Sequence, residues 1–156
     1  MGEREDLVEK LAAAPDRVAK LIEGLSEEAL RRRPAEGEWS MKEVCGHLVE
    51  DARTWQERVT LVTTQADAYL KRYDPEAGVR EGGYQEAPIE ETMDEFRRVR
   101  GQTIELLSGL SAEGWERTGR HWSEGEMTVA KACEIALEHA EMHLEQLRET
   151  RDKVTS

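Results

Sequence analysis

The sequence has few aromatic residues, few cysteines and no long apolar run, and each shortage excludes a class of protein. Only 5% of the residues are aromatic, and the β-branched residues never form the alternating runs that predict strands. No apolar stretch has the length of a transmembrane helix or follows the start as in a secretion signal. Two cysteines among 156 residues do not make a disulfide framework. We therefore expect a soluble, cytoplasmic protein with reduced thiols and no membrane partner.

Positive charge is also scarce, with 22 Lys and Arg against 34 Asp and Glu and a net charge of -12. A negative surface repels phosphate backbones, so we expect no nucleic-acid partner. The abundant residues are Lys, Arg, Glu, Ala and Leu, which favour helix over sheet. An apolar share of 38% in 156 residues is enough for one core. The sequence therefore predicts a single domain over residues 1–156.

Apolar residues spaced three and four apart predict four amphipathic helices. These helices lie near residues 4–24, 40–70, 89–109 and 127–150. Ser40 and Glu43 have the spacing of a capping box at the start of the second helix. Pro15 lies inside the first helix and predicts a kink or a break there. Glycine-containing segments at 73–87 and 111–126 predict long connections. We expect an all-α four-helix bundle without a sheet.

Three of the four histidines fall on predicted helices and could bind a metal ion together. His139 and His143 are four residues apart, so one helix face carries both imidazoles. Such a pair is also typical of two solvated or core histidines. However, His143 is in register with an apolar seam and should face the core. A buried imidazole needs polar partners, which a metal ion could provide. His47 lies on the flank of the second seam and can face inward. We predict that His47, His139 and His143 bind one divalent ion and leave a position for water or substrate. Zinc, nickel and iron suit three imidazoles about equally.

The other candidate side chains favour structural roles. Cys45 and Cys133 point away from the nearest histidines on their helices, which indicates small packed residues. His121 lies in a predicted loop and is more typical of a solvated histidine than of a ligand. The basic residues 31–33 follow acidic residues, and in so acidic a chain they favour a solvated helix end with salt bridges over an anion site.

The stretch Gly37–Leu48 reads Gly-Glu-Trp-Ser-Met-Lys-Glu-Val-Cys-Gly-His-Leu and resembles the DinB-like (DinB/YfiT) superfamily. Gly125–Val129, followed by His139 and His143, resembles the second half of that family. The matching pieces are short, but they cover nearly the whole chain in the right order. The resemblance implies an up-up-down-down four-helix bundle, a three-histidine site for a divalent metal and a homodimer.

The resemblance also implies a thiol-dependent activity. We expect a metal-dependent thiol S-transferase that acts on a small-molecule substrate in detoxification or stress response. A low-molecular-weight thiol would be the co-substrate, held by the metal as the reactive thiolate. Metal-dependent hydrolysis, with water in place of the thiol, is an alternative. A second alternative is a non-catalytic metal-binding stress protein. No residue in the sequence selects one low-molecular-weight thiol over another.

Overall fold

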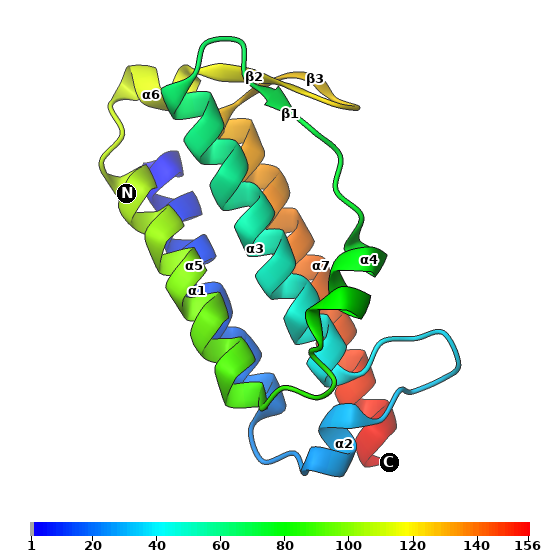
Figure 1. Cartoon of the computed structure of the whole chain (residues 1–156). Helices are drawn as coiled ribbons and strands as arrows, with labels where there is room; N and C mark the ends of the chain where they lie inside the picture. Colours follow the sequence, from blue (N-terminus) through cyan, green and yellow to red (C-terminus); the bar gives the residue numbers. More distant parts are fainter. Residues whose placement is uncertain (1) are drawn as a thin grey trace.

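A computed structural model describes residues 2–156 and shows four long helices, three short helices and a small sheet. The long helices are α1 (Glu3–Ile22), α3 (Met41–Thr64), α5 (Ile89–Ser108) and α7 (Val129–Thr155). The short helices are α2 (Glu27–Arg31), α4 (Pro75–Gly82) and α6 (Ala112–Glu116), and the strands are β1 (Tyr69–Leu70), β2 (Thr118–His121) and β3 (Gly125–Thr128). The four-helix bundle predicted from the apolar spacing is confirmed (Figure 1).

The long helices pack in a square in which α1 and α3 each contact α5 and α7. Arg97 pairs with Asp16, and Arg100 reaches Leu11, so α1 and α5 run in opposite directions. Figure 1 shows that α3 runs parallel to α5 and antiparallel to α7. In chain order the helices therefore run up-down-down-up, where the resemblance implied up-up-down-down.

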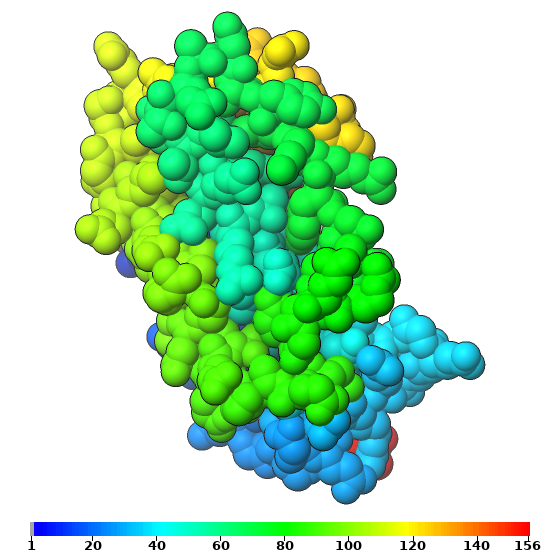
Figure 2. Space-filling model, viewed as in Figure 1, coloured from blue at the N-terminus to red at the C-terminus, as the bar shows by residue number. Residues whose placement is uncertain are grey.

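Because α3 and α5 are parallel, the chain must return along the length of the bundle between them. Residues 65–88 make this crossover, which contains β1 and α4 and lies over one face of the bundle (Figures 1 and 2). Residues 73–87 were predicted to be a loop, but Asp74 caps α4 by accepting from the amides of Glu76 and Ala77. The ring of Tyr84 packs where a side chain on Gly46 would lie, so α3 and the crossover meet closely.

The prediction of a bundle without a sheet is wrong. β2 and β3 form an antiparallel hairpin, and β1 pairs in parallel with β2. Consequently the second long helix ends at Thr64 and not near residue 70. Leu70 of β1 and Met127 of β3 are buried, so the sheet closes one end of the core. Strands of two to four residues are too short to show alternation in the sequence.

The predicted break at Pro15 does not occur, because α1 is continuous from Glu3 to Ile22. Proline has no amide hydrogen, so the carbonyl of Leu11 lacks the helical partner four residues on. Arg100 of α5 fills this role, and its Nη1 donates to the Leu11 oxygen at 2.9 Å in the core. A guanidinium from a neighbouring helix thus satisfies the carbonyl that the proline leaves open.

The predicted start of α3 is confirmed. The Ser40 hydroxyl accepts from the Glu43 amide, and the Glu43 carboxylate accepts from the Ser40 amide. Within residues 2–156, no helix is both long enough and apolar enough to cross a membrane.

Candidate metal centre

The antiparallel helices α3 and α7 bring two of the three predicted ligands into contact. The ring centroids of His47 and His143 are 4.3 Å apart, and the rings meet edge to face at 73°. His47 is only 5% exposed. Burial and the neighbouring His143 lower the pKa of His47 to about 4, so this imidazole is neutral at physiological pH.

His139 lies one turn before His143 on α7 and faces Asp51 of α3. The His139 Nδ1 is 3.7 Å from Oδ1 of Asp51, a charge contact slightly longer than an ordinary hydrogen bond. Interaction with this carboxylate raises the pKa of His139, although partial burial opposes the effect. The ring of Trp55 packs beside the imidazole with centroids 6.1 Å apart.

The three imidazoles are close together but have not converged on a single point. Across residues 2–156, no three His, Cys, Asp or Glu side chains are arranged as a ready metal-binding set. The rings of His47 and His143 contact each other, whereas Nδ1 of His139 faces Asp51.

The donor chemistry of the three rings nevertheless fits a divalent ion. The Nδ1 of His47 is buried and has no hydrogen-bond partner among residues 2–156, which is unfavourable for a polar atom. The Nδ1 of His143 lies 2.8 Å from Oε1 of Gln146, a contact that leaves Nε2 of this ring outside the hydrogen bond and available to an ion. Neutral imidazoles with a free lone pair are the form that binds zinc and similar ions.

The remaining sequence predictions have mixed outcomes. His143 was expected to face the core, but it is half-buried and Leu144 occupies the core instead. Cys45 and Cys133 are packed as predicted, and burial raises the pKa of each thiol to about 12. His121 was predicted to lie in a loop but is the last residue of β2. Its Nδ1 accepts from the amides of residues 123 and 124.

The basic run at residues 31–33 forms salt bridges, as predicted. Arg31 pairs with Glu86, Arg32 with Glu28, and Arg33 with Glu43.

Two residues lie beside the histidines that the sequence did not place there. Trp39 packs on His47 with ring centroids 5.0 Å apart. Asp51 is 3% exposed and lies four residues after His47, on the same face of α3. A charged residue on an apolar helix face was the available signal for Asp51.

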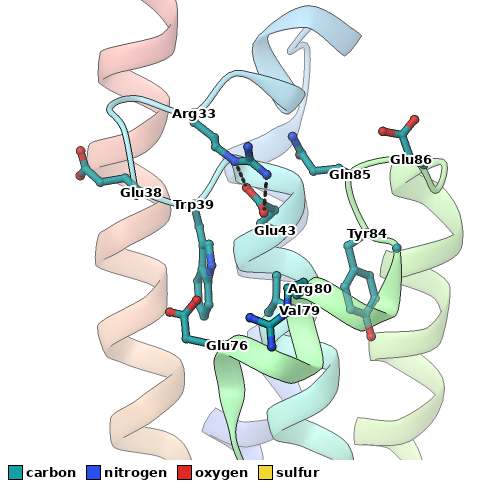
Figure 3. Close-up of a pocket in the computed structure, with 12 residues that line it drawn as sticks. Arg33, Glu38, Trp39, Glu43, Glu76, Val79, Arg80, Tyr84, Gln85 and Glu86 are labelled. Carbon is teal, nitrogen blue, oxygen red and sulfur yellow. Dashed lines mark hydrogen bonds and ion pairs between the residues drawn. The ribbon is translucent and has the colours of Figure 1, made fainter.

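A cavity of about 430 Å³ is lined in part by Trp39. Figure 3 shows it between the segment 33–39, the start of α3 and the end of the crossover, with Arg33 bound to Glu43 on one wall and Arg80 and Tyr84 on the other. None of the three histidines lines this cavity, but Trp39 borders both the cavity and His47.

The comparison with known proteins gives one family. Residues 10–147 match the DinB superfamily. The uncharacterised protein YuaE of Bacillus subtilis (strain 168) is 29% identical over 147 residues, which cover 85% of this chain and 90% of YuaE. A protein of Oceanobacillus iheyensis named "Putative metal-dependent hydrolase" is 24% identical over 137 residues, which cover 88% of this chain and 79% of that protein.

Solved structures show the same fold. YfiT from Bacillus subtilis, described as "a probable metal-dependent hydrolase with an unusual four-helix bundle topology", has a TM-score of 0.87 at 18% identity, over 96% of this chain and 87% of YfiT. A conserved protein from Enterococcus faecalis has a TM-score of 0.73 at 17% identity, over 99% of this chain and 98% of that protein.

Proposed function

Because the chain belongs to the DinB superfamily, we propose that it is a metal-dependent enzyme whose divalent ion is bound by His47, His139 and His143. The observation that carries the proposal is the buried, neutral imidazole of His47, whose ring contacts His143 and whose Nδ1 has no partner in the described part of the chain. A purely structural histidine in a core would have its polar atoms paired.

A divalent ion held by these three imidazoles would lower the pKa of a bound water or thiol and so would supply a nucleophile at neutral pH. The chain itself holds the rings and limits access to them. His47 is fixed between Trp39 and His143, and the crossover covers the neighbouring part of α3. The cavity that Trp39 lines is large enough for a small-molecule substrate.

Neither cysteine of the chain supplies the nucleophile. Cys45 and Cys133 are buried, and their raised pKa values keep both thiols protonated. Water would make the protein a hydrolase, which the names of the Oceanobacillus relative and of YfiT support. A small thiol would make it the S-transferase that the DinB-like sequence motifs imply.

Metal content tests the proposed centre. We expect purified wild-type protein to bind one equivalent of zinc or nickel, and His47→Ala, His139→Ala and His143→Ala to bind it far more weakly. The matched control is His121→Ala, which removes the fourth histidine and should retain the metal. Circular dichroism checks that each variant stays helical. Equal metal content in wild type and all three ligand variants would reject the centre.

A second experiment separates the two nucleophiles. The metal-loaded protein is incubated with activated esters and with an alkylating electrophile, each with and without a low-molecular-weight thiol. A hydrolase releases acid or alcohol without thiol, whereas an S-transferase forms a thioether only with thiol, as mass spectrometry would show. Either activity should disappear with a chelator. A metal-bound protein inactive under all conditions would leave the non-catalytic alternative.

A further inference from the structure

Asp51 is a buried carboxylate beside the candidate metal centre. It lies on α3 one turn after His47, and only 3% of the residue is exposed. A buried charge is unfavourable unless it has partners. Its surroundings therefore indicate what the carboxylate does.

The partners of Asp51 come from α7 and from the crossover. In the described part of the chain, His139 is the single basic residue with a nitrogen within 4.0 Å of the carboxylate, at 3.7 Å through Nδ1. The hydroxyl of Tyr73 donates to the same oxygen at 3.4 Å. Arg58 and Arg100 lie farther away and contribute charge without an ion pair. The carboxylate is thus held by the crossover and directed at one imidazole.

From this geometry we infer that Asp51 is the positioning residue of His139, keeping the ring hydrogen on Nδ1 so that Nε2 is left for the metal ion. The inference rests on the proposed metal centre. A carboxylate that accepts from the second nitrogen of a ligand histidine fixes its tautomer and orientation, and its loss typically weakens metal affinity about 10- to 100-fold. On the neighbouring ligand candidate, Oε1 of Gln146 lies 2.8 Å from Nδ1 of His143.

The test compares two neighbouring carboxylates that are neutralised in the same way. Asp51→Asn should weaken zinc binding about 10- to 100-fold, as measured by competition with a chromogenic chelator. Glu50→Gln removes the same charge from the adjacent residue, which contacts Tyr84 and Arg53 and no histidine, and should leave zinc affinity unchanged. Thermal melts of the metal-free proteins show whether each variant folds.

Ring tautomers give a readout that depends neither on bound metal nor on activity. In metal-free wild type, above the pKa of His139, the ¹⁵N shifts of this ring should report hydrogen on Nδ1. In Asp51→Asn they should move toward the Nε2–H tautomer, whereas in Glu50→Gln they should not.

The outcomes separate the inference from the proposed function. Weak zinc binding in Asp51→Asn alone, with the tautomer shift, supports the positioning role. Equal zinc affinity in Asp51→Asn and wild type, or an Nε2–H tautomer in wild type, overturns that role while leaving the metal centre in place. Wild-type protein that binds no zinc would reject the centre and this role together.

Discussion

Arg100 carries a charge into the core, where its hydrogen-bonding partner is the backbone carbonyl of Leu11. The residue is 5% exposed, and burial lowers the pKa of its guanidinium. The carbonyl needs this donor because Pro15 cannot supply an amide hydrogen. The proline and the arginine therefore form one unit, although they lie on different helices.

This coupling predicts a double-mutant result. Arg100→Met should destabilise the wild type by leaving the buried carbonyl without a donor, at a cost of about 1–3 kcal/mol. In a Pro15→Ala background the new amide can bond to Leu11, so the same substitution should cost less, with a coupling energy of about 0.5–3 kcal/mol. Urea unfolding followed by circular dichroism measures all four proteins. An equal effect of Arg100→Met in both backgrounds would contradict the explanation.

The sequence identified His47, His139 and His143 as candidates because helical periodicity places residues of known spacing on one face. The sequence could not predict how far each imidazole is buried, because burial depends on how α3 and α7 are rotated against each other. His143 was therefore expected in the core, where Leu144 lies. Asp51 was missed because its partner, His139, is distant in sequence and on another helix.

At the scale of helices, the long elements were predictable and the short ones were not. Repeated seams give the four long helices a signal over 20 residues or more. β1 and β2 have two and four residues and owe their pairing to the crossover that brings them together. Their formation depends on tertiary contacts that local sequence does not show.

The contact between α3 and the crossover predicts an unusual response to alanine at Gly46. An added Cβ would lie 2.2 Å from Cγ of Tyr84, so Gly46→Ala should destabilise the protein by about 1–3 kcal/mol through overpacking. The matched control is Gly101→Ala in α5, where a Cβ meets nothing within 4 Å, and which should stabilise by up to about 1 kcal/mol through helix propensity.

Thermal melts of both variants, and of Gly46→Ala combined with Tyr84→Gly, test this explanation. In the Tyr84→Gly background, which lacks the ring, adding Gly46→Ala should no longer lower the melting temperature. Equal changes in melting temperature for Gly46→Ala and Gly101→Ala in the wild-type background would show that the ring of Tyr84 does not restrict the space at Gly46.

The start of α3 predicts a pH dependence of stability. Burial alone would raise the pKa of Glu43, but hydrogen bonds from Arg33 and Ser40 outweigh it and lower the pKa below the usual 4.5. A carboxyl with a lower pKa in the folded state stabilises fully above its unfolded pKa and loses that contribution as pH falls through the folded pKa. The stability difference between wild type and Glu43→Gln should therefore be constant near pH 7 and shrink below about pH 4.5.

Chemical denaturation at a series of pH values measures this difference. Arg33→Met is the companion variant, because without the guanidinium the pKa of Glu43 should rise and the stabilisation should be lost at a higher pH. A difference that does not change with pH would show that the ionised carboxylate contributes nothing to folding.

For the whole molecule, the proposed centre joins two helices that are distant in sequence. His47 is on α3, and His139 and His143 are on α7, so an ion bound to all three would link the two halves of the chain. The unfolded chain has no such site, and binding to the folded state alone stabilises it. At a free zinc concentration of 100 times Kd, the free energy of unfolding should rise by about 2.7 kcal/mol.

This gain should appear as a rise in melting temperature of roughly 5–10 °C, since a domain of this size shifts by about 2–4 °C per kcal/mol. The rise should depend on zinc concentration, vanish in His143→Ala and persist in His121→Ala. Partial binding of zinc to histidines in the unfolded chain would reduce the shift in every variant alike, so the comparison between His143→Ala and His121→Ala is the informative one. The same rise in both variants would place the stabilising ion elsewhere, and α3 and α7 would then be held by packing alone.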